Sequence, residues 1–154
     1  MCIRDRMITG SHNASNYNGI KMVINNKTLF DNHIIEIYKS IISNEFKKNE
    51  VQGKLIKNDA VLDNYIQDIK DDINIKSKLK ICIDCGNGIT GAITRKVFNA
   101  LNIDFDIIYE NVDGSFPNHP PDPTDERNLL ELKNIIVKNK SDIGFAYDLS
   151  LIHI

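Results

Sequence analysis

The sequence predicts an α/β fold with a mainly parallel sheet, and three observations support that class. Short apolar segments of strand length alternate with longer segments whose apolar residues recur at helical spacing. A glycine-rich turn, residues 86–91, follows one of these strands directly and opens a helix. The 154 residues, of which 42% are hydrophobic, can bury a core in one domain or in parts of two. Strands separated by helices pair in parallel through right-handed crossovers.

The first quarter of the chain is expected to hold one strand and one helix. Residues 20–24 are predicted to form a strand that follows a polar, asparagine-rich loop. A helix is predicted from about residue 30 to Phe46, with Thr28 and Asp31 forming a capping box at its start. The apolar residues that recur at helical spacing along it are Phe30, Ile34, Ile37, Tyr38, Ile41 and Ile42.

A second amphipathic helix, with apolar residues from Leu62 to Ile73, follows a polar stretch and precedes the expected domain boundary at residues 74–78. Beyond that boundary, strands and helices alternate, and one connecting loop contains all four prolines. The predicted elements there are a strand at 79–84, a helix at 91–101, a strand at 104–109, a helix at 126–139 and a strand at 142–147.

Two cysteines in the body of the chain, Cys82 and Cys85, have C-x-x-C spacing. A thioredoxin-like motif opens a helix, whereas these residues lie on and just beyond a predicted strand. No second pair of Cys or His residues is spaced to complete a zinc site. We therefore expect two buried, free thiols in a reducing compartment.

The glycine-rich turn offers one alternative function. Gly86, Gly88 and Gly91 match G-x-G-x-x-G between a strand and a helix. Glu110 follows about 20 residues on, where a ribose-binding acid of a dinucleotide site would lie. A Rossmann-type dinucleotide-binding domain is therefore the alternative hypothesis. The other interpretation is a tight strand-to-helix turn that binds no nucleotide.

The four prolines, Pro117, Pro120, Pro121 and Pro123, all lie in the loop that precedes the predicted helix at 126–139. Their fixed φ angles and missing N–H groups favour an irregular, largely extended path. We interpret this segment as a stiff connection between elements, and we assign no chemistry to it or to His119.

The charge balance excludes some classes of partner. There are 19 Lys and Arg residues against 21 Asp and Glu residues, and the formal net charge of −2 indicates no basic face for nucleic acid. No apolar run is long enough to span a bilayer, and residues 1–6 are not a secretory signal. We expect a cytoplasmic protein with neither a nucleic-acid nor a membrane partner.

The segment with the most chemical potential is the loop before the first predicted strand. It places the hydroxyl of Ser11, the imidazole of His12 and the ammonium group of Lys21 within eleven residues, beside Gly10 and Gly19. A tight polar loop of this kind can present a serine oxygen to a ligand, with a cation close by. This arrangement is suited to phosphoryl chemistry.

Residues 9–23, TGSHNASNYNGIKMV, resemble the phosphoserine loop of the α-D-phosphohexomutases, in particular the bacterial phosphomannomutase/phosphoglucomutase branch. Ala14 departs from the family pattern, which usually has proline there. Residues 79–92 and 112–123 are similar to the start and middle of the second domain of that family, in the same order. Residues 141–148 stand where its metal loop begins.

The resemblance implies part of a first domain and most of a second α/β/α domain with a mainly parallel sheet. It also implies an enzyme that moves a phosphoryl group between O1 and O6 of mannose or glucose phosphate, through a hexose 1,6-bisphosphate. Ser11 would carry the phosphoryl group, with His12 and Lys21 as further catalytic residues. Magnesium would be held by Ser11 and by Asp148, which matches the first aspartate of the family's metal loop.

Both ends of the chain are expected to be foreign to the protein. Residues 1–6 and 149–154 can be encoded by DNA strings that are reverse complements, as a sequencing adapter read at both ends would be. The expected organisation is then a partial first domain at 7–57, a connecting helix and linker at 58–77, and a second domain at 78–148. We expect the chain alone to be inactive, because the later metal ligands and sugar-binding domains of the family are not in it.

Overall fold

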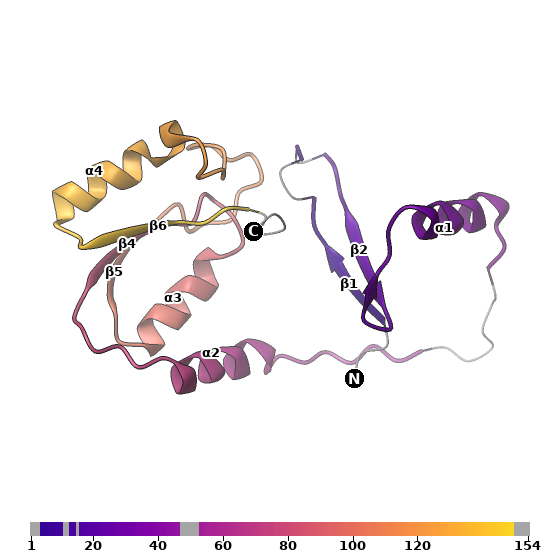
Figure 1. Ribbon diagram of the computed structural model, residues 1–154, viewed down its shortest axis with the longest axis horizontal. Helices are drawn as coiled ribbons and strands as arrows, with labels where there is room; N and C mark the ends of the chain where they lie inside the picture. Colours follow the sequence, from indigo (N-terminus) through magenta and orange to yellow (C-terminus); the bar gives the residue numbers. More distant parts are fainter. Residues whose placement is uncertain (1–3, 11–12, 15, 47–52, 150–154) are drawn as a thin grey trace. The chain divides into compact units, whose positions relative to one another are not determined.

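The computed structural model describes residues 4–10, 13–14, 16–46 and 53–149, and the chain divides into two compact units (Figure 1). The first unit is Met1–Lys57 and the second is Asn58–Ile154. The division falls ahead of helix α2 (Val61–Asp72) rather than after it, because α2 packs against helix α3 (Gly91–Ala100).

The first unit contains an antiparallel sheet of three strands in the order β1-β2-β3. Strand β2 (Ile20–Ile24) has the predicted bounds, whereas β1 (Arg4–Ile8) and β3 (Lys27–Thr28) were not predicted. Strand β1 pairs with β2 along its whole length. The β2–β3 connection is a two-residue turn, Asn25–Asn26, with φ angles of 50° and 61°. Asparagine tolerates this left-handed conformation, which matches the twist of a hairpin.

Helix α1 (Asn32–Ser43) follows this sheet, but the predicted capping box is wrong. Thr28 lies in β3, and Asp31 is the N-cap residue itself. The φ of Asp31 is 45°, outside the extended region that capping side chains use, and its carboxylate makes no capping hydrogen bond. The helix ends three residues before the predicted Phe46, because Asn44 adopts the left-handed conformation that closes a helix.

The second unit contains the parallel sheet that the sequence predicts, in the order β5-β4-β6. The strands are β4 (Lys80–Asp84), β5 (Asp104–Ile108) and β6 (Ile143–Ala146). Helix α3 connects β4 to β5. The predicted helix at 126–139 begins as a 3₁₀ turn, η1 (Glu126–Leu129), before it continues as α4 (Leu130–Asn139).

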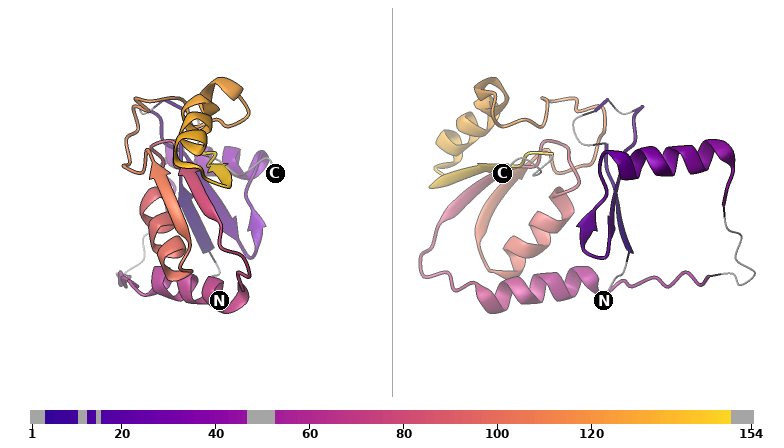
Figure 2. Two further views of the ribbon diagram at one scale, coloured as in Figure 1. Left: turned by 90° about the vertical axis from the view of Figure 1, so that its left-hand side faces the viewer. Right: turned by 45° about the vertical axis from the view of Figure 1, so that its right-hand side comes forward.

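The two crossovers of this sheet run in opposite directions from β4. The first leads to β5 on one side, and the second returns past β4 to β6 on the other side. Right-handed crossovers that reverse direction place their helices on opposite faces, and α3 and α4 do cover opposite faces of the sheet (Figures 1 and 2). The carboxyl ends of β4 and β6 therefore flank the topological switch point, where open α/β sheets bind ligands.

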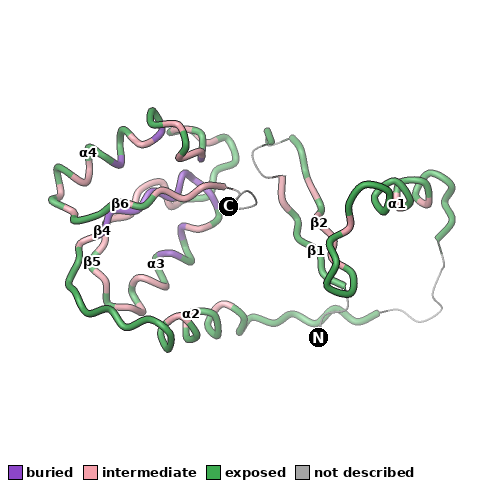
Figure 3. Tube along the Cα trace, viewed as in Figure 1, coloured by how far each residue is buried: buried purple, intermediate pink, exposed green. Residues whose placement is uncertain are grey.

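The second unit holds the buried core of the described residues, centred on β4 (Figure 3). Its buried apolar side chains are Ile81, Cys82, Ile83, Cys85 and Leu132. Both cysteines are free, as predicted, and burial raises the pKa of each thiol. Within the described ranges, no helix has both the length and the apolar character needed to cross a bilayer.

Candidate functional site

The loop that carries the predicted catalytic serine connects β1 to β2. Its base is closed by a hydrogen bond of 2.9 Å from the Thr9 N–H to the Gly19 carbonyl. A Cβ atom at Gly19 would overlap the Thr9 carbonyl oxygen, so this position requires glycine. Two further main-chain bonds fold the loop into turns, from Asn13 to Gly10 and from Tyr17 to Ala14. The described part of this loop, residues 9–10, 13–14 and 16–19, is therefore closed at its base and held by two main-chain turn bonds.

Of the three predicted catalytic residues, the structure places one. Ser11 and His12 lie outside the described residues. Lys21 is the second residue of β2, pairs with Met7 across the hairpin and is half-buried. It follows the base of the loop by two residues, so its backbone is fixed by the sheet. The contribution of these residues to catalysis stays a prediction.

In the second unit, polar side chains gather at the carboxyl end of β4. Asp84 is the last residue of this strand and is 1% exposed. Its Oδ1 accepts a hydrogen bond of 2.8 Å from the Gly86 N–H. Its Oδ2 lies 2.9 Å from Nε2 of His119, whose Nδ1 lies 2.8 Å from the Pro120 carbonyl oxygen. A buried carboxylate is costly unless it is paired, and both oxygens of Asp84 have partners.

Asn87 connects the same turn to the exit of β5 and to the loop beyond it. Its backbone N–H donates to the Tyr109 carbonyl at 2.9 Å. Its side-chain amide donates to the Asn111 carbonyl and accepts from Nδ2 of Asn118. Asn87 adopts a φ of 56° and is 6% exposed, and its main-chain groups and its side chain all have hydrogen-bond partners, as buried polar groups require.

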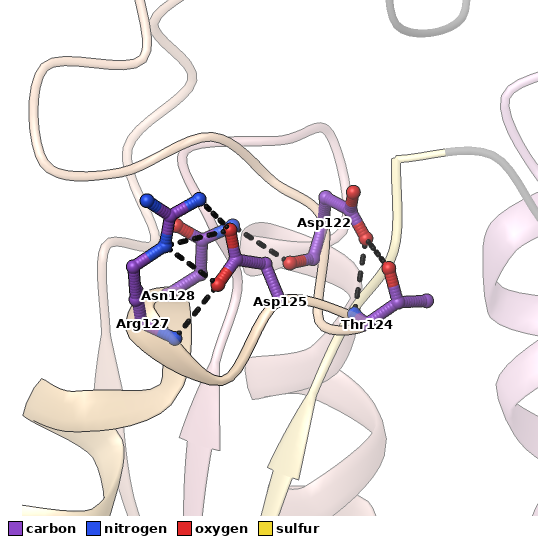
Figure 4. Close-up of polar contacts among 5 residues, drawn as sticks. All are labelled: Asp122, Thr124, Asp125, Arg127 and Asn128. Atoms are coloured by element: carbon purple, nitrogen blue, oxygen red, sulfur yellow. Dashed lines mark hydrogen bonds and ion pairs between the residues drawn. The ribbon is translucent and has the colours of Figure 1, made fainter.

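The proline-rich loop, defined here as residues 113–125, is itself ordered by short-range side-chain bonds (Figure 4). Oδ1 of Asp122 accepts from the backbone N–H and the hydroxyl of Thr124. The Asp122 carbonyl accepts from the amide of Asn128. Asp125 caps η1 through the Arg127 N–H, and its hydrogen bonds with the Arg127 guanidinium lower the pKa of Asp125 to about 2. The loop thus enters α4 along a defined path.

Asp148, the predicted metal ligand, follows β6 at the same edge of the sheet. The residues on both sides of it make main-chain hydrogen bonds: Tyr147 N–H to the Asp84 carbonyl at 2.9 Å, and Leu149 N–H to the Pro121 carbonyl at 3.2 Å. A carboxylate is the ligand type that Mg²⁺ prefers. Within the described part of the chain, however, no three acidic, His or Cys side chains group into a metal site. The role of Asp148 as a magnesium ligand stays a prediction.

The last glycine of the glycine-rich turn has a structural role in the packing of α3. A Cβ atom at Gly91 would overlap the Glu110 carbonyl oxygen, so this glycine serves the close approach of α3 to the chain after β5. The Glu110 carboxylate pairs with the Arg95 guanidinium at 2.5 Å. The structural interpretation of the glycines is favoured over the Rossmann alternative.

Sequence reasoning missed the buried pair of Asp84 and His119. The two residues are 35 positions apart, and only the path of the proline-rich loop brings them together. One signal was available, because an aspartate that ends an otherwise apolar strand at a buried sheet edge needs a partner. The sequence analysis assigned no chemistry to His119 and did not identify it as the partner of Asp84.

Two family models match the chain in order. The model "Phosphoglucomutase/phosphomannomutase, alpha/beta/alpha domain I" matches residues 3–48, and the model for domain II of the same proteins matches residues 63–149. The curated relatives include a phosphomannomutase/phosphoglucomutase of Pseudomonas syringae, 39% identical over 142 residues. A phosphoglucomutase of Neisseria meningitidis serogroup A is 37% identical over 142 residues. Each of these two matches covers 92% of this chain.

The structural comparison gives the same result. A phosphoglucomutase/phosphomannomutase family protein from Burkholderia thailandensis matches with a TM-score of 0.84 and 34% identity, over 94% of this chain and 31% of that chain. A putative phosphomannomutase from Thermus thermophilus, at 17% identity and a TM-score of 0.67, shares the fold; the match covers 96% of this chain and 35% of that chain. The chain spans about 30% of the length of the curated relatives it matches.

Proposed function

The chain belongs to the phosphoglucomutase/phosphomannomutase family, and from that premise we propose that the whole protein is a phosphohexomutase. It moves a phosphoryl group between O1 and O6 of a hexose phosphate, with mannose and glucose phosphates as the candidate substrates. The observation that supports this proposal is the ordered match to domains I and II, with the serine loop inside the first match. A cytoplasmic location is the predicted setting.

The proposed carrier of the phosphoryl group is Ser11. In the first step, the free hydroxyl of the sugar phosphate attacks phosphorus, the bond from phosphorus to the Ser11 oxygen breaks, and the proton of the attacking hydroxyl ends on that serine oxygen. The product is a hexose 1,6-bisphosphate and a free serine. After the bisphosphate has reoriented, the serine hydroxyl attacks its other phosphate. The bond from that phosphorus to the sugar oxygen breaks, the serine proton ends on the sugar oxygen, and phosphoserine is restored as the isomer leaves. Phosphoryl transfer of this kind depends mainly on positioning and on charge stabilisation.

Two neighbours of Ser11 have proposed roles. Lys21, held by the pairing of β2 with β1, would stabilise the negative charge on the transferring phosphoryl oxygens. His12, beside the serine in sequence, would donate to a phosphate oxygen or assist the hydroxyl proton. The fixed backbone at the base of the loop supports this proposal, because the Thr9–Gly19 bond anchors the segment that carries Ser11 and His12.

The family is generally magnesium-dependent, and we propose Ser11 and Asp148 as two of the ligands. Bound magnesium would neutralise charge on the phosphoryl oxygens. The contribution of this chain to that site is a carboxylate whose flanking residues are both fixed by main-chain hydrogen bonds. Further ligands are needed, since Asp148 alone does not make a site.

The test is Ser11→Ala in the full-length enzyme, with Ser15→Ala as the matched control in the same loop. We expect Ser11→Ala to lower turnover by about 10⁴-fold or more and to abolish the single phosphate seen in the intact mass. Lys21→Ala should lower turnover less, by roughly 10²- to 10³-fold. Wild-type turnover in Ser11→Ala, without phosphate at that position, would overturn the assignment. The 154-residue chain itself should show no mutase activity.

A further inference from the structure

We propose that His119 and Asp84 form a positioning pair that locks the proline-rich loop onto the sheet and thereby fixes the backbone on both sides of Asp148. The catalytic consequence rests on the proposed function, whereas the structural link does not. His119 was assigned no chemistry from sequence, and the pair lies 35 positions apart. It joins the end of β4 to the loop whose Pro121 carbonyl bonds the chain beyond β6.

Both ring nitrogens of His119 lie within hydrogen-bond distance of an oxygen atom. Nδ1 faces the Pro120 carbonyl, which can only accept, so this nitrogen carries a proton. Nε2 faces Oδ2 of Asp84 at 2.9 Å, so both ring nitrogens face oxygen atoms. The side chain of His119 is 15% exposed and that of Asp84 is 1% exposed. A buried bond of this type is stronger and more costly to break than one at the surface.

The same two segments hold the chain around Asp148. The Asp84 carbonyl accepts from the N–H of Tyr147, the residue before Asp148. The Pro121 carbonyl, two residues from His119, accepts from the N–H of Leu149, the residue after it. Leu149 is expected to be foreign, so in the full-length protein the residue that follows Asp148 there would supply this N–H. Detaching His119 would loosen the part of the loop around Pro121 and its bond to residue 149, while the bonds from Asn118 to Asn87 and from Asn128 to Asp122 would remain. The bond from Tyr147 to Asp84 would remain, because it uses the backbone of β4.

Two residues near the pair have strained backbone conformations that neighbouring contacts must hold in place. Tyr109, whose ring lies edge-on to that of His119 with centroids 5.4 Å apart, has a φ of 52°. Phe116 in the loop has a φ of 48°. Bulky side chains rarely adopt this conformation, and it persists where the neighbouring contacts hold it. The junction also occupies the switch point between β4 and β6, where this class of sheet binds ligands.

The first test measures hydrogen–deuterium exchange at single amides in the 154-residue chain. His119→Phe keeps an aromatic ring and removes both nitrogens. We expect the Leu149 amide to exchange about tenfold faster or more, with a smaller change at Tyr147 and none at Ile81 and Ile83 in β4. His119→Gln retains a donor near the position of Nε2, so it should restore part of the protection. Arg127→Gln, in the neighbouring ion pair, is the control and should leave Leu149 unchanged.

Two outcomes overturn the structural link. One is a wild-type exchange rate at Leu149 in His119→Phe. The other is equally faster exchange throughout β4 and β6 in both His119 variants, because the pair would then hold the whole sheet and not this segment. Faster exchange confined to the loop and Leu149, with partial rescue by glutamine, supports it.

The second test addresses catalysis in the full-length enzyme. His119→Phe should lower kcat about tenfold and leave KM within about twofold, because the misplaced group acts in the chemical step. His119→Gln should recover part of kcat, and Arg127→Gln should behave as wild type. Unchanged kcat in His119→Phe would overturn the positioning role. It would leave the mutase assignment intact, because that assignment is tested separately by Ser11→Ala.

Discussion

The two units of this chain differ in how their apolar side chains are used. In the first unit, no described residue is buried, and α1 exposes large apolar side chains such as Ile41 and Ile42, at 54% and 69%. In the second unit, Ile83 and Cys82 are fully buried, and β4 has neighbours on both edges and both faces. The first unit carries the predicted phosphoryl-transfer loop, and the second carries the core.

This contrast distinguishes structure that short-range interactions specify from structure that burial of distant residues stabilises. The hairpin of the first unit is specified by short-range signals, namely paired strands, an asparagine turn and a glycine that admits a close carbonyl. The second unit adds burial, which supplies most of the stability of a folded domain. The predicted catalytic motif could therefore be proposed from local sequence, whereas the support for the backbone around Asp148 depends on residues that are distant in sequence.

The largest expected effect comes from a substitution that disrupts the packing of the second unit. Gly91→Val places side-chain atoms where the Glu110 carbonyl lies, so α3 must separate from the chain after β5. We expect a loss of about 4 kcal/mol or more in the free energy of unfolding, measured by urea titration with circular dichroism. Gly53→Ala is the control, because a Cβ atom at Gly53 would meet no other atom within 4 Å; its change should stay within about 0.5 kcal/mol. Equal effects at both glycines would contradict the close approach.

Two isoleucine-to-alanine substitutions, one in each unit, test the difference in burial between the units. Ile83→Ala removes a fully buried side chain and should cost about 3 kcal/mol of unfolding free energy. Ile41→Ala removes a side chain that is 54% exposed and should cost less than about 1 kcal/mol. Both variants are measured by the same urea titration. If Ile41→Ala cost as much as Ile83→Ala, α1 would be buried in solution and the contrast between the units would fail.

The smallest expected effect concerns ion pairs within the second unit. Arg95 pairs with Glu110 and lies over the Phe105 ring at 5.8 Å, with its side chain 47% exposed. Arg95→Gln should cost about 0.5–1 kcal/mol of unfolding free energy in the same titration, and part of this cost should persist in high salt because ring packing is not screened. The Arg127 side chain is 86% exposed, and Arg127→Gln should give no measurable change. A larger loss at Arg127 would reverse this ranking.

Much of the fold could be predicted because its signals are local. Strand β2 was placed at its observed bounds, and the alternation of strands and helices from residue 79 onward matches the structure within one or two residues. Parallel pairing followed from that alternation. Strand β1 was missed because RDRMI has no apolar alternation and its pairing is provided by β2. The capping box failed because Thr28 pairs in β3 instead.

The candidate site divides in the same way. Ser11, His12 and Lys21 were identified from a contiguous motif, and their catalytic roles remain predictions. The link from Asp84 to His119 could not be read from spacing, because it requires the loop's path and the burial of a carboxylate. Neither the path of the loop nor the burial of the carboxylate is encoded in a short sequence pattern. Both depend on how the strands and their connections are arranged in the sheet.

The bond from the N–H of residue 149 to the Pro121 carbonyl uses main-chain atoms on both sides. Residue 149 is expected to be foreign to the protein, but this link needs only a main-chain N–H. Any residue other than proline that follows Asp148 in the full-length protein can therefore make it. On the other side, the link uses only the carbonyl of Pro121. Proline directly after Asp148 is thus the substitution that a saturation library of the full-length gene should exclude because of this link, whatever else the metal loop requires there.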